Sequence, residues 1–246
     1  MNETLRVIHS LCSNHHGFTE EPVTDAELEL ILSACMRAPN ASNRQRYSIV
    51  VLDDPTVIKE LARTTGYKAL MFCVDSNRIM DTAAHMGLEY KLGDISPFVT
   101  GLTDTVLAAQ TAAIAARSMG LDVLFSTRMF RNVSTIYELL ELPQAYCFPV
   151  ALLLLGHAKV APKYKMGRIR GPGIVHYGTY RRASAQELES LVHQYDAPHM
   201  GLNPTWKDKG YAHYLEWFFN KWTAKSERGE QHSEMFQVLK RSGYLE

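Results

Sequence analysis

The chain has 246 residues, of which 46% are hydrophobic, so it can bury a sizeable core, and disordered or collagen-like classes are excluded. Lysine and arginine total 26, as do aspartate and glutamate, which leaves no basic surplus to indicate nucleic acid or anionic lipid as a partner. The four cysteines are widely spaced and form no C-x-x-C pair, so we expect reduced, mostly buried thiols and no bound metal.

Residues 1–10 mix charged and apolar side chains and lack the long apolar segment of a signal peptide. The longest apolar run, residues 148–155, is far shorter than the roughly 20 residues of a membrane-spanning helix. We therefore expect a cytoplasmic protein with no membrane partner. Because linkers and repeats are not evident, we expect one domain over residues 1–246, with 197–246 as a helical C-terminal extension.

Helices and strands alternate along much of the chain. Thr24 and Glu27 form a capping box ahead of a helical apolar pattern, and Pro39 ends that pattern. Apolar runs predict strands at 47–52, 69–74, 121–125 and 147–155, and the last is apolar on both faces and therefore central. Further helices are expected at 55–63, 103–119 and 134–142. This order predicts a layered α/β fold.

The remaining third of the sequence changes in character. Residues 159–173 mix lysine and arginine with proline and glycine, which predicts a basic loop suited to an anion. A helix from Gln186 to about Tyr195, a polar loop and an aromatic helical region that begins near Trp206 are expected to follow. The aromatic stripe is too wide for a lone surface helix, so we expect it to cover the core or a partner subunit.

The loop at residues 38–47, between the capped helix and the first strand, is a candidate binding site. It reads A-P-N-A-S-N-R-Q-R-Y and offers hydroxyl and amide side chains next to a proline. Such groups can bind a polar ligand edge or a phosphate through side chains and backbone. The same composition is also typical of an ordinary helix-to-strand turn.

This loop resembles the A-P-S-A-x-N-x-Q-P-W motif of the FMN-dependent nitroreductase family, and further landmarks follow in the family's order. They are Phe18 to Val23, the alanine-rich helix with Gln110 and Gly120, Leu142-Pro143 and Leu155-Gly156. Residues 72–78, Val175-His176 and the aromatic extension favour the larger NADPH-flavin oxidoreductase branch, the oxygen-insensitive nitroreductases. The resemblance implies a three-layer α/β (α+β) sandwich with a mixed sheet flanked by helices, and a C-terminal extension that wraps the partner of a homodimer.

In that family FMN lies between the two subunits, so the resemblance implies a set of cofactor-binding residues here: Ser13, Asn14, His16, Pro39, Asn40, Ala41, Ser42, Asn43, Lys68, Thr127, Arg128, Lys165 and Arg168. Two positions depart from the family pattern. Both arginines of the usual Arg-Ser-x-Arg segment are missing from residues 13–16, and Thr127-Arg128 stands where the family often has two glycines. Phosphate contacts are therefore expected mainly from the basic loop, for which a solvated loop is the alternative.

Two of these side chains have a specific expected role. The resemblance places Lys68 near the N1–O2 edge of the flavin, where a cation stabilises the reduced anion, and the alternative is an exposed lysine at the start of a strand. If His16 replaces a phosphate-binding arginine, FMN affinity falls as the pH rises and the imidazole loses its proton. The alternative for His16 is a surface histidine.

The activity that the resemblance implies is transfer of electrons from NADPH or NADH to a small acceptor such as a nitroaromatic or a quinone. The nucleotide delivers hydride to flavin N5 and leaves before the acceptor binds, so no catalytic side chain is predicted. Residues 197–206 lack the arginines that this branch uses for the extra phosphate of NADPH, for which Lys207, Lys209 and Arg228 can substitute. The alternatives are another electron donor, a non-catalytic flavin- or ligand-binding protein, and a dimer without flavin.

Overall fold

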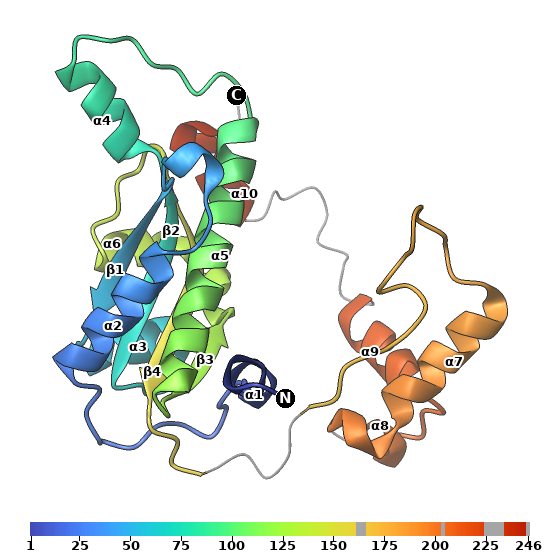
Figure 1. Cartoon of the computed structure of the whole chain (residues 1–246). Helices are drawn as coiled ribbons and strands as arrows, with labels where there is room; N and C mark the ends of the chain where they lie inside the picture. The colour runs from blue at the N-terminus through green and yellow to red at the C-terminus, as the bar shows by residue number, and fades with distance from the viewer. Residues whose placement is uncertain (161–165, 203–204, 224–233, 245–246) are drawn as a thin grey trace. The chain divides into compact units, whose positions relative to one another are not determined.

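The computed structural model describes the chain except residues 161–165, 203–204, 224–233 and 245–246 (Figure 1). The chain divides into two compact units, Met1–Ala161 with His232–Glu246, and Pro162–Gln231. The boundary that the sequence suggests at residue 197 falls inside the second unit.

A four-stranded sheet forms the middle of the first unit, in the order β1-β2-β4-β3. The strands are β1 (Tyr47–Leu52), β2 (Lys68–Asp75), β3 (Asp122–Ser126) and β4 (Cys147–Gly156). β2 and β4 are central, which confirms the central position predicted for the strand at 147–155. All neighbouring strands pair antiparallel, whereas a mixed sheet was predicted. Among the described residues, the only parallel pairing is a single bridge between Ser13 and Val123. Because the segment around Ser13 pairs at a single residue, it adds no parallel strand.

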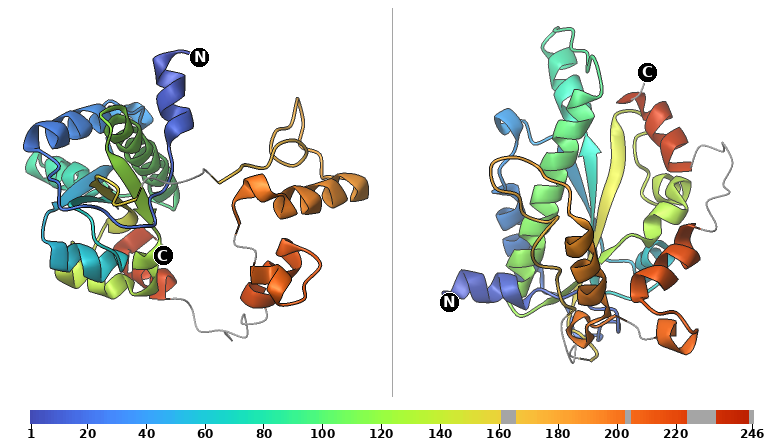
Figure 2. Two further views of the ribbon diagram at one scale, coloured as in Figure 1. Left: turned by 90° about the horizontal axis from the view of Figure 1, so that it is seen from below. Right: turned by 90° about the vertical axis from the view of Figure 1, so that its right-hand side faces the viewer.

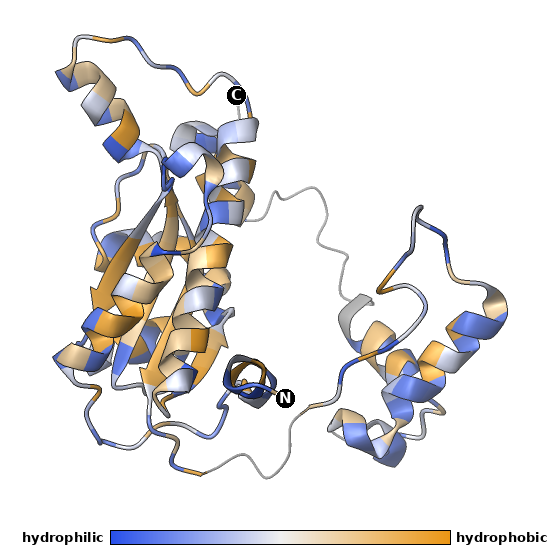
Figure 3. Ribbon diagram, viewed as in Figure 1, coloured by the Kyte–Doolittle hydropathy of each residue, from blue (hydrophilic) through white to orange (hydrophobic). Residues whose placement is uncertain are grey.

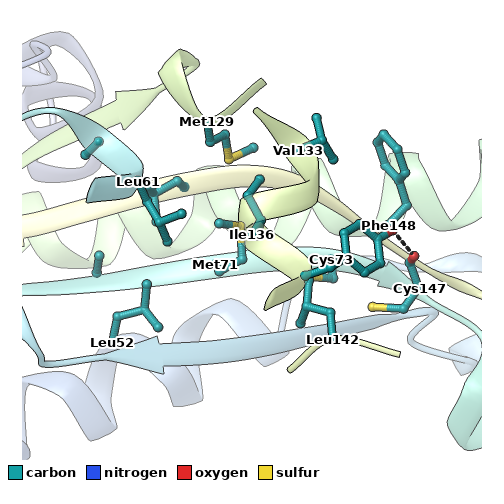
Figure 4. Close-up of a cluster of buried hydrophobic side chains, with 14 of the residues drawn as sticks. Leu52, Leu61, Met71, Cys73, Met129, Val133, Ile136, Leu142, Cys147 and Phe148 are labelled. Carbon is teal, nitrogen blue, oxygen red and sulfur yellow. Dashed lines mark hydrogen bonds between the residues drawn. The ribbon is translucent and has the colours of Figure 1, made fainter. Parts of the chain in front are cut away.

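Helices cover both faces of the sheet, which confirms the predicted three layers; Figure 2 shows α5 and α10 on opposite sides of the strands. One face carries α2 (Asp25–Met36) and α5 (Ser96–Ser118), and the other carries α3 (Pro55–Ala62), α6 (Val133–Leu139) and α10 (Glu234–Leu239). Side chains of β2 alternate between the two cores, as the pleat of a strand requires. Leu70 and Phe72 join the first core, whereas Met71 and Cys73 join the second, which Figure 4 shows.

Figure 3 shows hydrophobic residues concentrated on the strands and on parts of the helices that flank them. Among the described helices, only α5 is long and apolar enough to cross a membrane by length and composition. It packs instead into the core, where Ala108, Ala112 and Ala116 are buried beside the sheet and α2. α1 (Glu3–Ser10) and α4 (Asn77–His85) were not predicted from the sequence, and neither contains a fully buried residue.

The second unit is helical and contains α7 (Ala185–Asp196), the short turn Pro198–Met200, α8 (Thr205–Asp208) and α9 (Tyr214–Thr223). A capping box between Ser184 and Glu187 begins α7. The aromatic stripe packs partly within this unit, because Tyr214 of α9 stacks on Tyr195 of α7 with ring centroids 6.2 Å apart. Residues 166–184 form no helix or strand, as the predicted loop requires.

The end of the C-terminal extension packs on the first unit of its own chain. Val238 of α10 and Tyr244 are buried in the core of the first unit of their own chain. The Tyr244 ring lies 5.0 Å from that of Phe98, and its hydroxyl donates to the Tyr146 carbonyl at 2.7 Å. These side chains therefore complete a core within the chain, and wrapping of a partner by the extension stays a prediction.

Candidate functional site

A first group of predicted cofactor-binding residues lies at one end of the sheet and consists of Ser13, Asn14, His16 and Lys68. Ser13 bridges Val123 of β3, and Val123 pairs with Leu155 of β4. Leu155 in turn pairs with Lys68 at the start of β2. With about 4.8 Å between neighbouring strands, this row places the backbone of Ser13 about 14 Å from that of Lys68.

Asn14 fixes the loop that carries His16. It is 2% exposed, and its backbone N–H donates to the Val123 carbonyl at 2.9 Å. Its side chain donates to the Gly17 carbonyl at 2.8 Å and accepts from the His16 N–H at 3.0 Å. Asn14 therefore shapes the loop, whereas His16 itself is exposed at the surface.

Lys68 holds a shielded positive charge at the same end of the sheet. Its side chain is only 12% exposed, so the alternative of an exposed lysine does not describe it. The Nζ atom lies 3.5 Å from Oδ1 of Asp25, whose own side chain is 96% exposed. Because water screens that carboxylate, the ammonium remains available to a second anionic group.

The second group, Pro39 to Asn43, lies at the opposite end of α2. Asp25, the partner of Lys68, begins this helix, and the loop follows its last residue, Met36. A helix of 12 residues spans about 18 Å. The loop leads into Tyr47, which pairs with Val74 at the end of β2 that lies away from Lys68. Within one chain, the structure therefore does not bring Lys68 and this loop together.

The loop has a strained backbone that its neighbours hold in place. Ser42, Asn43 and Gln45 have φ values of 55°, 54° and 47°, in the left-handed region that costs energy for residues with a side chain. The Asn40 side chain accepts from the Gln45 N–H at 3.1 Å, and the Asp104 carboxylate accepts from the Ala41 N–H at 2.9 Å. Ser42 and Asn43 remain exposed, which leaves a hydroxyl and an amide at the surface.

Asp104 is a candidate positioning residue that does not belong to the predicted cofactor-binding set. It is 2% exposed and lies within α5, where it binds the Ala41 amide instead of capping its own helix. Its Oδ2 atom is buried and has no hydrogen-bond partner among the residues that the structure describes. The spacing of Asp104, Ala108 and Ala112 along one helix face is the sequence signal that predicts this burial.

Thr127 and Arg128 form a third group, directly after β3. Both are exposed, and Arg128 lines a cavity of about 320 Å³ beside α3. The other lining residues are Glu60, Leu61, Arg63, Met129, Asn132 and Thr135. The cavity thus contains Arg128 but neither Lys68 nor the loop at 39–43.

The predicted basic loop belongs to the second unit. Arg168 is exposed, and its guanidinium donates to the carbonyls of Met166 and Gly167 at 3.1 and 2.9 Å. Gly167 approaches the backbone closely, because a Cβ atom there would lie 2.8 Å from the His199 carbonyl oxygen. Lys165 lies outside the described residues.

Comparisons with known proteins give a consistent result. The model of the Nitroreductase family matches residues 15–157, which is more than half of the chain. FMN reductase [NAD(P)H] from Bacillus subtilis is 30% identical over 209 residues, covering 80% of this chain and 81% of the relative. Oxygen-insensitive NADPH nitroreductase from Salmonella typhimurium is 29% identical over 204 residues and covers 80% of each chain.

Solved structures share the fold. NfrA2 from B. megaterium superposes with a TM-score of 0.81 at 24% identity, covering 100% of this chain and 99% of that one. NfrA1 nitroreductase from B. subtilis gives a TM-score of 0.82 at 22% identity, with 98% of each chain covered.

Proposed function

Because the chain belongs to the nitroreductase family, we propose that it is an FMN-dependent oxidoreductase that passes electrons from NADPH or NADH to a small acceptor such as a nitroaromatic or a quinone. The observation that carries this proposal is the 30% identity to an FMN reductase across four fifths of both chains. We also propose a cytoplasmic location.

The residues present fit an FMN molecule in their chemistry. Lys68 offers a cation that is mostly shielded from water, which suits the edge of the flavin where negative charge accumulates on reduction. Ser42 and Asn43 offer exposed polar groups on a loop whose backbone is anchored by the hydrogen bond from the Ala41 N–H to the Asp104 carboxylate. FMN itself supplies the electron-transfer chemistry, so the chain needs to bind and orient it but needs no nucleophile of its own.

The electrostatic contribution of Lys68 follows from its burial. A charge that is 12% exposed is screened by water much less than a surface lysine, so it acts more strongly on a nearby anion. Asp25 offsets this charge only weakly because its carboxylate is almost fully exposed. Lys68 therefore favours a ligand that becomes more negative on reduction, and Lys68→Met is expected to lower the flavin reduction potential. Lys59→Met, at an exposed position on α3, is the matched control.

We propose further that two copies of the chain form a homodimer and share each FMN site. Within one copy, Lys68 lies near the first residue of α2 and the loop at 39–43 follows the last, so the length of the helix, about 18 Å, separates them. A twofold axis that sets α2 of one copy beside α2 of the other brings the loop of each to Lys68 of its partner. The separation seen in one chain supports this arrangement.

Mixed dimers test the shared site. One chain carries Lys68→Met, and the other carries Ser42→Ala with Asn43→Ala, so that each homodimer binds FMN poorly. In a mixed dimer with shared sites, one site carries all the substitutions and the other carries none. Random pairing then restores about a quarter of the FMN-binding sites. A site confined to one chain gives no recovery and contradicts the proposal.

The electron donor is tested by a steady-state assay of the FMN-loaded protein with NADPH and NADH in turn. Lys207 and Lys209 are exposed in the second unit and are available to the extra phosphate of NADPH, whereas Arg228 lies outside the described residues. We expect turnover with at least one nucleotide and a raised KM for NADPH in Lys207→Ala with Lys209→Ala. Absence of turnover with both nucleotides would contradict the proposed activity.

A further inference from the structure

Two histidines and an aspartate converge within the second unit, and none of them belongs to the predicted FMN-binding set. His193 and Asp196 lie on α7, and His213 directly precedes α9. One nitrogen or carboxylate oxygen from each residue lies within 4.8 Å of those from the other two. The rings of His193 and His213 meet edge to face, with centroids 5.7 Å apart.

The secondary structure explains why these side chains meet. Residues three and four apart share one face of a helix, so Glu189, His193 and Asp196 lie on the same side of α7. The Tyr195–Tyr214 stack, with ring planes 14° apart, holds the start of α9 against this helix. His213 is thereby placed beside the acidic end of α7.

Asp196 is oriented for a ligand role by a backbone contact. Its Oδ1 atom accepts from the Tyr214 N–H at 2.8 Å, and its Oδ2 atom lies 2.6 Å from Nδ1 of His213. The Asp196 side chain is 17% exposed, whereas those of His213 and His193 are 37% and 64% exposed. The cluster therefore has a fixed carboxylate on its inner side and an opening to solvent, through which an ion can enter.

We propose that His193, Asp196 and His213 bind a divalent transition-metal ion of the zinc type. Two imidazoles with one carboxylate suit Zn²⁺ better than Mg²⁺ or Ca²⁺, which prefer oxygen ligands. Zinc binds nitrogen and oxygen at about 2.1 Å, so tetrahedral ligand atoms lie about 3.4 Å apart. The Asp196–His213 pair, now 2.6 Å apart, has to open by about 0.8 Å to reach this spacing, and the His193 nitrogen already lies within 4.8 Å of both partners.

Glu189 provides an adjoining carboxylate. Its Oε1 atom lies 3.3 Å from Nε2 of His193. Glu189 or a water molecule completes the fourth position, and in either case the site stays accessible from solvent. The ion would link α7 to the start of α9 and so stabilise the second unit.

A simple ion pair is the competing explanation for the same geometry. A proton shared between Asp196 and His213 accounts for their 2.6 Å contact but needs no contribution from His193. A metal ion, by contrast, needs both imidazoles. Substitution of His193 therefore separates the two explanations, and because this side chain is well exposed, its loss does not disturb the core.

Calorimetric titration of ZnCl₂ into the chelator-treated full-length protein is the test. We expect one zinc ion per chain, with affinity lowered at least about tenfold in His193→Gln and in Asp196→Asn. The matched control is His199→Gln, an exposed histidine of the same unit. A second control, His15→Gln with His16→Gln, removes the adjacent histidine pair in the first unit.

Co²⁺ substitution provides a readout that does not depend on flavin or turnover. We expect the visible absorption of tetrahedral cobalt in the wild type and in both controls, and its loss in His193→Gln. Unchanged zinc affinity and an unchanged cobalt spectrum in His193→Gln would overturn the proposal. Loss of zinc binding only in the His15 and His16 variant would also overturn it, because the ion then binds the adjacent pair.

Discussion

Substitution of Asp104 tests whether this buried carboxylate holds the candidate FMN-binding loop. In Asp104→Ala, the Ala41 N–H loses its acceptor at 2.9 Å. A hydrogen bond to a charged group contributes about 1.5–3 kcal/mol to stability. Removing the side chain also removes the cost of burying Oδ2, which has no hydrogen-bond partner among the described residues, so the net loss is smaller. We expect the free energy of unfolding to fall by about 1–2 kcal/mol. Asp104→Asn keeps an acceptor oxygen and should cost less.

The same substitution is expected to weaken FMN binding. Ser42 and Asn43 lie in the left-handed region, so the loop relaxes toward a more favourable backbone once its anchor is lost. If FMN binding must return the loop to its original conformation at a cost of about 1.4 kcal/mol, the dissociation constant for FMN rises about tenfold. The affinity of Asp104→Asn should stay within about threefold of the wild type.

Urea unfolding and fluorescence titration of the apoprotein with FMN measure the two effects. Asp81→Ala, at an exposed carboxylate on α4, is the control and should change neither. The reasoning is refuted if Asp104→Ala binds FMN as tightly as the wild type. It is also refuted if Asp104→Asn is as damaging as Asp104→Ala, because the acceptor oxygen would then have no role.

Three further predictions concern the scaffold. A thiol reagent should modify only Cys12 quickly in the native protein and all four thiols after unfolding, because Cys35, Cys73 and Cys147 are buried and burial also raises the pKa of the Cys35 thiol; fast native reaction of more than one thiol would contradict the packing. The Arg181 guanidinium and the Ser184 N–H lower the pKa of Glu187 to about 2 from 4.5, so this carboxylate stabilises the fold above pH 4.5 and loses its effect as the pH falls toward 2. The stability difference between wild type and Glu187→Gln should therefore shrink on acidification, and a difference that grows would reverse the sign of the argument. Tyr244→Phe should lower the free energy of unfolding by about 0.5–1.5 kcal/mol in urea, because the half-buried Tyr146 carbonyl loses the hydroxyl donor at 2.7 Å but keeps the Ser76 N–H at 2.9 Å; an unchanged midpoint would mean that this bond contributes nothing.

Helices and strands are predicted well where the signal lies in residues adjacent in the sequence. The capping box at Thr24 and the apolar alternation at 47–52 identify α2 and β1, because both signals come from adjacent residues. α1 and α4 were not predicted, because each has only eight or nine residues and none of them is fully buried. The return of α10 to the core of the first unit depends on contacts with residues far away in the chain, which no local pattern carries.

The candidate site shows the same limit. The motif at 38–47 and the position of Lys68 are readable from the sequence, but their separation follows from the direction of α2 between them. The anchor Asp104 comes from a third element, and the cluster of His193 with His213 requires the packing of α7 against α9. Such contacts between distant segments are set by tertiary structure, so sequence periodicity indicates burial but not the partner.

An anaerobic absorbance titration tests the proposed activity most directly. The protein is loaded with FMN, desalted and then titrated with NADPH and, separately, with NADH. We predict that the flavin band survives desalting and bleaches in proportion to at least one nucleotide, with full bleaching at about one equivalent per FMN. A band that persists with both nucleotides would contradict the oxidoreductase proposal, and loss of all FMN on desalting would contradict the cofactor site itself.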